Sequence, residues 1–190
     1  MKAEEKIYQA FFELKEAKLY YNQLKEHTKL SHSSLQNTLD KLTSSNILKQ
    51  EKTKSNTFYI IADKKIFALK FSEIAIKQFN NLNLGVKNPL RNFLKKIPQD
   101  SYTVVLFGSA SRGEEQKGSD IDLLIVTNRK INLSNNKKDA ELTSKYSISI
   151  FQATTEQFLK NEDDLIIQAR KTGFPIYKEQ NFYEVISDEY

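Results

Sequence analysis

The stretch LFGSASRGEEQKGSDIDLLIV, residues 106–126, contains the features that decide both the fold and the chemistry of this chain. It begins at the end of a β-rich apolar run and continues through Gly108 and Ser109. After ten more residues, Asp120 and Asp122 stand at the start of a second apolar run. Side chains two residues apart in a strand point to the same side. The spacing therefore predicts two carboxylates together on one face of a mostly buried strand.

Two adjacent carboxylates need a positive partner, because burying like charges costs several kcal/mol per ion. Mg²⁺ takes oxygen ligands and is commonly held by one or two carboxylates plus substrate phosphates. A glycine at a strand end lets the backbone approach a ligand, and a helix after it directs free N–H groups at an anion. We therefore expect a nucleoside triphosphate here, with phosphates at Gly108 and Ser109 and Mg²⁺ at Asp120 and Asp122.

The Gly-Ser pair, ten residues and Asp-x-Asp resemble the signature of the DNA polymerase β-like nucleotidyltransferase superfamily. The string GSASRG also resembles the start of its small prokaryotic members, the minimal nucleotidyltransferases. The resemblance covers residues 101 to about 178. It implies that Asp120 and Asp122 are the catalytic, Mg²⁺-binding pair and that Gly108 and Ser109 bind the nucleotide. It further implies transfer of a nucleoside monophosphate, expected to be AMP from ATP, to a hydroxyl, with release of pyrophosphate.

The same resemblance implies a specific protein acceptor, since many minimal nucleotidyltransferases act as antitoxins that modify a tyrosine of a HEPN-type toxin. Arg112 fits the basic residue that is usual in the motif and would then help to bind the nucleotide. Alternatively, Arg112 forms a surface ion pair with Glu114 or Glu115.

The third strand departs from the family pattern. A third carboxylate is usual there, but the candidate strand reads YSISIF, residues 146–151. Alternation predicts Ile148 and Ile150 toward the core, with Ser147 and Ser149 toward the cleft. We expect Ser149 at the place of the missing carboxylate, and a serine is neither a useful base nor a strong Mg²⁺ ligand. The acidic residues nearby in sequence fall on predicted helices: Asp139, Glu141 and Glu156.

Composition limits the remaining possibilities. The 190 residues contain no cysteine, which excludes a disulfide scaffold, a thiolate nucleophile and a thiolate metal site. The N-terminal residues lack the apolar region of a signal peptide, and no run approaches the roughly 18 apolar residues of a membrane span. We therefore expect a soluble, cytoplasmic protein with no membrane partner.

The positive charge is concentrated in one half of the chain. Residues 1–97 carry 18 Lys and Arg against 9 Asp and Glu, whereas residues 98–190 carry 11 against 15. This asymmetry favours nucleic-acid binding by the first half. The alternative is an evenly solvated lysine surface.

Local patterns in the first half predict three short helices and a hairpin. Apolar residues at helical spacing place the helices at roughly 3–16, 20–28 and 32–44. Ser31 is expected to cap the third helix, and Asn46 to follow it in the left-handed conformation. Two β-like runs joined by TKSN, ILKQEK and TFYII, then predict a hairpin with Lys52 and Lys54 at its tip.

This order resembles the winged helix-turn-helix family over about the first 62 residues. The resemblance implies DNA binding, with the third helix in the major groove and the hairpin lysines on phosphate. The implied contact residues are His32, Ser33, Gln36, Asn37, Lys41, Lys52 and Lys54. The alternative is a winged helix that serves protein contacts or dimerisation, in which case the protein would be a homodimer.

The predicted fold is α+β. It has a winged helix at 1–62, a helical connector at 63–97 and a nucleotidyltransferase domain with a short mixed sheet flanked by helices at 98–190. In the connector, a second short helix is expected after Pro89. Two rival functions remain: a DNA-binding regulator whose degenerate transferase domain senses a nucleotide, and a transferase acting on a small molecule such as an aminoglycoside.

Overall fold

The chain forms two compact units, each built from helices and one sheet. The structure is a computed structural model that describes residues 2–116 and 118–186. One unit runs to Ile74 and includes the chain from Tyr183, and the other comprises Ala75–Phe182. The chain is therefore an α+β protein, as predicted, while the boundaries expected at residues 62 and 97 stay predictions.

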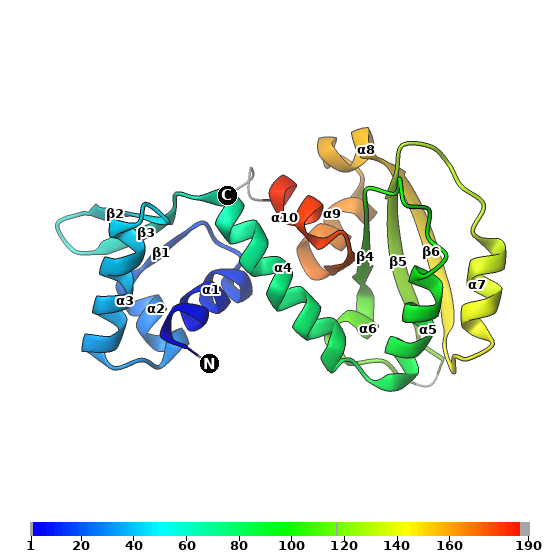
Figure 1. Cartoon of the computed structure of the whole chain (residues 1–190), viewed down its shortest axis with the longest axis horizontal. Helices are drawn as coiled ribbons and strands as arrows, with labels where there is room; N and C mark the ends of the chain where they lie inside the picture. Colours follow the sequence, from blue (N-terminus) through cyan, green and yellow to red (C-terminus); the bar gives the residue numbers. More distant parts are fainter. Residues whose placement is uncertain (1, 117, 187–190) are drawn as a thin grey trace. The chain divides into compact units, whose positions relative to one another are not determined.

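The first unit combines helices with a small antiparallel sheet (Figure 1). Its elements in chain order are α1 (Ala3–Leu14), β1 (Lys18–Tyr20), α2 (Tyr21–Thr28), α3 (His32–Ser44), β2 (Leu48–Lys52), β3 (Thr57–Ile61) and α4 (Lys64–Asn81), which continues past the boundary. The central strand is β3, antiparallel to both β1 and β2. The three-residue β1 was not predicted, because so short a strand has no periodic signal.

Local signals fix the ends of α3. The Ser31 hydroxyl accepts a hydrogen bond from the Ser34 amide at 3.3 Å, which confirms the predicted N-cap. After the helix, Asn46 has φ 56°, the left-handed conformation expected there. The apolar face of the helix, Leu35, Leu39 and Leu42, is buried. The opposite face is therefore free to carry polar residues.

The second unit contains one four-stranded mixed sheet. Its elements are α5 (Leu84–Leu94), β4 (Thr103–Phe107), α6 (Gly108–Arg112), β5 (Asp120–Thr127), α7 (Ser134–Glu141), β6 (Ser147–Thr154), α8 (Thr155–Lys160), α9 (Asp164–Thr172), β7 (Phe174–Tyr177) and α10 (Glu179–Ile186), which crosses the boundary. The strand order is β6-β5-β4-β7, with β5 parallel to β6 and the other pairs antiparallel. The end of β4 and the start of β6 consequently flank the start of β5 (Figure 1).

The connector helix α5 corrects one expectation. The sequence predicts a break through residue 89 and a helix after it, but α5 begins at Leu84 and contains Pro89. The Asn83 side chain caps its start by accepting from the Gly85 amide at 2.6 Å. A proline inside a helix loses a backbone hydrogen bond, and burial of Val86, Leu90 and Pro89 itself offsets that loss.

Candidate active site

The turn from β4 into α6 brings the backbone against a carboxylate. Phe107, the last residue of β4, pairs directly with Asp122 of β5. The next residue, Gly108, has φ 72°, in the left-handed region that favours glycine. A Cβ atom at this position would lie 2.3 Å from Asp122 Oδ2. Only glycine therefore permits both this conformation and this close approach.

Asp120 and Asp122 lie on one face at the start of β5, as the spacing predicts. Asp120 is exposed and Asp122 is half-buried. Across the parallel pair with β6, Asp120 lies opposite Ser147, and Asp122 lies opposite Ser149. The two aspartates thus occupy the middle of three adjacent strand ends, between the Gly108 turn on one side and two serines on the other.

Both serine hydroxyls donate hydrogen bonds to Asp120. Ser147 Oγ bonds to Asp120 Oδ1, and Ser149 Oγ bonds to Asp120 Oδ2 at 3.0 Å. Ile148, between them, is fully buried. The predicted alternation of this strand is therefore observed for these three residues, and no carboxylate of β6 faces the aspartates, since β6 contains none.

The two carboxylates have opposite electrostatic surroundings. The Ser147 hydroxyl, then the Ser149 hydroxyl and the charge of Lys137, lower the pKa of Asp120. Burial raises the pKa of Asp122, and the negative charge of Asp120 raises it further. A cation placed beside the pair would therefore stabilise the ionised form of Asp122 more than that of Asp120.

The remaining motif residues organise the turn. Arg112 Nε donates to Glu114 Oε2 at 2.7 Å, the ion pair foreseen as an alternative, while Arg112 Nη1 donates to the Gly108 carbonyl at 3.1 Å. Ser111 Oγ donates to the same carbonyl at 2.8 Å. Ser109 is half-buried in the first turn of α6. Arg112 thus lies within the turn, and its guanidinium is already engaged by Glu114.

Two interactions near this turn were not predicted from the sequence. Lys137 lies on α7, and its positive charge lowers the pKa of Asp120, but no sequence motif links residues so far apart in the chain. In the loop before β5, Glu115 Oε1 accepts from Asn83 Nδ2 at 2.6 Å, and its other oxygen is buried without a hydrogen-bond partner among the residues that the structure describes. Lys137 was one lysine in a lysine-rich chain, and Glu115 was considered only as a partner of Arg112, so the sequence did not indicate these contacts.

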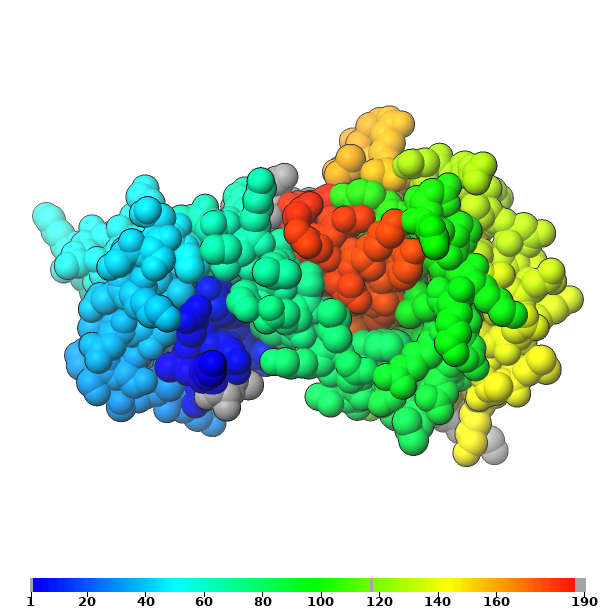
Figure 2. All heavy atoms as spheres, in the orientation of Figure 1, coloured from blue at the N-terminus to red at the C-terminus, as the bar shows by residue number. Residues whose placement is uncertain are grey.

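Seven residues of the first unit were predicted to contact DNA, and all of them lie on α3 or the β2–β3 hairpin. His32, Ser33, Asn37, Lys41, Lys52 and Lys54 are exposed, and Gln36 is partly exposed. Figure 2 shows the hairpin tip standing out from the surface of this unit. A concave pocket of about 370 Å³ lies between α3 and the hairpin, lined in part by Tyr21, His32, Gln36, Lys52 and Tyr59.

Several of these polar residues already have partners within the unit. Tyr21 Oη and His32 Nδ1 share a hydrogen bond of 2.6 Å, and Gln36 donates to Asp40 at 2.8 Å. Lys41 forms an ion pair with Glu4 at 3.2 Å. The two hairpin lysines, Lys52 and Lys54, have no ion pair within the described residues.

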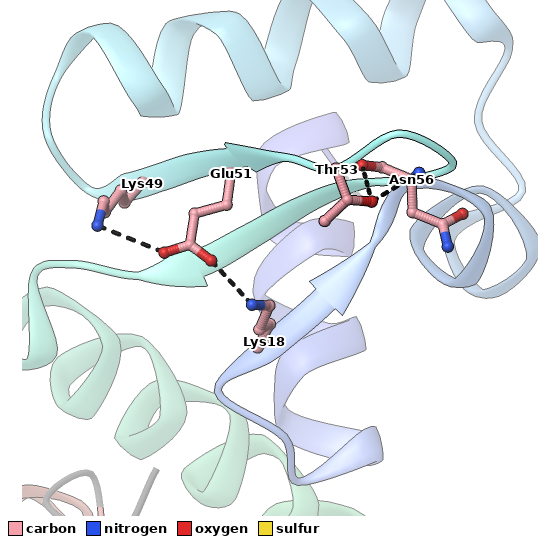
Figure 3. A network of polar contacts seen from close by, with 5 residues as sticks. All are labelled: Lys18, Lys49, Glu51, Thr53 and Asn56. Atoms are coloured by element: carbon pink, nitrogen blue, oxygen red, sulfur yellow. Dashed lines mark hydrogen bonds and ion pairs between the residues drawn. The ribbon is translucent and has the colours of Figure 1, made fainter.

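The base of the hairpin carries a separate network (Figure 3). Glu51 lies between Lys18 at 2.8 Å and Lys49 at 3.4 Å, and these bonds lower the pKa of Glu51, with Lys18 contributing most. At the tip, Thr53 and Asn56 bond to one another through backbone and hydroxyl groups. The tip turn is therefore closed by its own hydrogen bonds.

Two features are absent from the part of the chain that the structure describes. Within residues 2–116 and 118–186, no cluster of three or more His, Cys, Asp or Glu side chains could hold a metal ion by itself. Over the same residues, no helix combines the length and apolar character needed to cross a membrane.

Comparison with known proteins places the chain in a family. Neither the curated proteins nor the solved structures give a match. The sequence model of the nucleotidyltransferase domain matches residues 88–188, more than half of the chain and the whole of the β4–α6–β5 site. The chain belongs to the nucleotidyltransferase domain family.

Proposed function

We propose that the second unit transfers a nucleoside monophosphate from a nucleoside triphosphate to a hydroxyl group and releases pyrophosphate. The observation that carries this proposal is the close approach of Gly108 to Asp122, which joins the Gly-Ser turn and the Asp-x-Asp pair into one site. Gly108 and Ser109 would receive the phosphates, and Asp120 and Asp122 would lie beside the reacting phosphate. AMP is the group we expect, from the resemblance to minimal nucleotidyltransferases.

The aspartate pair fits a divalent cation, with Asp120 and Asp122 as the residues that would hold Mg²⁺. In the superfamily that the Gly-Ser and Asp-x-Asp residues resemble, the two aspartates hold Mg²⁺. The donors are hard carboxylate oxygens, one of them on a half-buried group whose pKa is raised by burial and by its neighbour's charge. Two carboxylates leave coordination positions for phosphate oxygens, as Mg²⁺ prefers. When bound, the ion would neutralise phosphate charge during transfer.

We further propose that the first unit is a winged helix that binds DNA. Its helices, its antiparallel sheet and its protruding hairpin support this assignment, as does the excess of Lys and Arg over residues 1–97. The exposed face of α3 would enter the major groove, and Lys52 and Lys54 would contact phosphates.

A regulator that senses a nucleotide without transferring it is the second candidate. The serines on β6 favour it, because Ser147 and Ser149 face the aspartates where the family usually has a third carboxylate. Loss of a general base typically costs about 10² to 10⁴-fold in rate. Binding would then survive while turnover with a partner, such as a protein tyrosine, becomes slow.

One experiment tests the proposal and separates the two candidates. The full chain is incubated with Mg²⁺, an acceptor hydroxyl such as that of a protein tyrosine, and each of ATP, CTP, GTP and UTP, and its melting temperature and pyrophosphate release are measured. We expect one nucleotide to raise the melting temperature by mass action, and Asp120→Asn with Asp122→Asn to abolish the increase. With the acceptor present, stabilisation without pyrophosphate release supports the regulator, and equal stabilisation of the double variant contradicts the site.

A further inference from the structure

We propose that this chain is also its own acceptor: the Ser147 hydroxyl receives the nucleoside monophosphate and becomes a nucleotidylated serine. This inference rests on the proposed transfer and adds a modification site within the site itself. The starting observation is that two serine hydroxyls of β6 lie beside the aspartates. A hydroxyl is the group to which the proposed reaction transfers the nucleotide.

Ser147 has the surroundings of an activated nucleophile. Its hydroxyl donates a hydrogen bond to Asp120 Oδ1. A serine is a weak nucleophile alone and is activated by a base within hydrogen-bond reach. Asp120 Oδ1 lies within that reach and aligns the hydroxyl, and its second oxygen is fixed by Ser149 at 3.0 Å, which orients the carboxylate toward Ser147.

The strand order places Ser147 on the attacking side. The Gly108 turn ends β4, the aspartates begin β5 and Ser147 begins β6, so the three groups follow one another across the sheet. Neighbouring strands are about 4.8 Å apart, which separates the turn from the serine by roughly 10 Å. In phosphoryl transfer the attacking and leaving oxygens lie in line. If the outer phosphates lie at Gly108, the pyrophosphate would therefore leave on the side away from Ser147.

The step is balanced without any further reactant. Ser147 Oγ attacks the α-phosphorus of the triphosphate, and its proton passes to solvent water. A bond forms between Oγ and the α-phosphorus, and the bond from that phosphorus to the oxygen of the β-phosphate breaks. Pyrophosphate leaves, and the product is a phosphodiester between the serine and the nucleoside.

Exposure distinguishes Ser147 from its neighbour. Ser147 is exposed at the first position of β6, whereas Ser149 is half-buried opposite Asp122. A nucleotidyl group is larger than the serine itself and needs open space around Oγ. Ser147 is therefore the serine that can carry the product.

The test uses the full chain with Mg²⁺ and ATP, and with the other three nucleotides in parallel. After chelation of the metal and denaturation, intact mass and peptide mapping are measured. We expect one nucleoside monophosphate per chain on Ser147, with label retained from the α-phosphate and lost from the γ-phosphate. The labelled fraction at a given time should not depend on protein concentration, because the nucleotide-binding site and the acceptor serine belong to one molecule.

Variants make the assignment specific. Ser147→Ala should lose the adduct, and Ser147→Thr should retain it because the hydroxyl is kept. Ser144→Ala is the matched control, since Ser144 lies three residues earlier and its hydroxyl accepts a hydrogen bond from the Tyr146 amide at 3.0 Å. This control should be labelled as fully as the unmodified sequence.

Melting temperature with Mg²⁺ and ATP, measured on the same samples, separates the two levels of inference. Stabilisation with no adduct, with an adduct on Ser149 or another residue, or with labelling that depends on protein concentration overturns self-modification at Ser147 and leaves the proposed function standing. Absence of both stabilisation and adduct with all four nucleotides overturns the proposed function, and this inference with it.

Discussion

The β4–α6–β5 site and the α3–hairpin face use polar residues in different ways. In the site, polar groups converge: Gly108 lies against Asp122, and two hydroxyls share Asp120. On the α3–hairpin face the polar residues are spread over an exposed surface, and several are satisfied by a single neighbour, as Lys41 is by Glu4. One substitution in the site should therefore disturb several contacts, whereas substitutions on the face should have separate, graded effects.

The largest effect is expected from Gly108→Ala. The added Cβ would lie 2.3 Å from Asp122 Oδ2, and an alanine at φ 72° is strained by about 1–3 kcal/mol. Asp122 must move, so we expect loss of stabilisation by Mg²⁺ and nucleotide as well as a lower melting temperature. Both quantities are measured by thermal unfolding with and without the ligand.

Gly113→Ala provides a matched control. Gly113 has φ 69°, almost the same strain, but nothing lies within 4 Å of an added Cβ. This variant should lose stability from the backbone alone and keep its response to Mg²⁺ and nucleotide. If both variants respond equally, the contact between the turn and Asp122 is not what holds the site together.

A graded effect is expected on the α3–hairpin face. Replacing Lys52 and Lys54 by Ala removes two proposed phosphate contacts, and each contact contributes about 0.9 to the slope of log affinity against log salt. The slope for duplex DNA should therefore become shallower by about 2. A titration of fluorescent duplex between low and physiological salt measures it.

Charge-matched controls test whether the hairpin matters or only the net charge. Lys25→Ala with Lys65→Ala removes the same charge from exposed positions outside the proposed contacts. The slope of log affinity against log salt should become shallower in the Lys52 and Lys54 double variant than in the Lys25 and Lys65 double variant. Equal losses would indicate non-specific attraction, and salt-independent binding of the unmodified chain would remove the DNA proposal altogether.

The site was predictable from the sequence because strand geometry is local. A period of two puts Asp120 and Asp122 on one face and Ser147 and Ser149 on another strand's equivalent face. Their meeting required only that the two strands be neighbours, which the pairing of Asp120 with Ser147 shows. The N-cap at Ser31 and the left-handed Asn46 were predictable for the same reason, since each depends on a few adjacent residues.

Features that depend on tertiary packing were not predictable. The start of α5 before Pro89 required knowing that the apolar face of this segment would be buried. Arg112 pairs with Glu114, one of the two partners that the sequence offered, but nothing in the sequence selected Glu114 over Glu115. The effect of the Lys137 charge on the pKa of Asp120 is likewise one choice among many available charges. A single sequence contains such charges in excess, so spacing alone cannot select the partners.

The smallest expected effect compares the two carboxylates of the site in the absence of metal. Burial and the charge of Asp120 raise the pKa of Asp122, so the folded state binds this proton more tightly than the unfolded state does. As pH rises from about 3.9, the ordinary value for aspartate, the unfolded state releases its proton first and stability falls. The fall ends once the pH exceeds the raised pKa of the folded state.

Asp122→Asn cannot titrate, so it should escape this loss and be more stable than the unmodified chain at neutral pH. The difference in unfolding free energy should grow with pH through that window and then remain constant. The contribution of Asp120 to stability has the opposite sign. Because the pKa of Asp120 is lowered, its ionised form stabilises the fold at pH values above the ordinary aspartate pKa, and that stability disappears as pH falls through the lowered pKa. Asp120→Asn should therefore reduce stability at neutral pH. Denaturant unfolding from pH 3 to 8 with a chelator measures the unfolding free energies of both variants. An Asp122→Asn variant that is less stable than the unmodified chain at pH 7 would show that burial and repulsion do not dominate at this carboxylate.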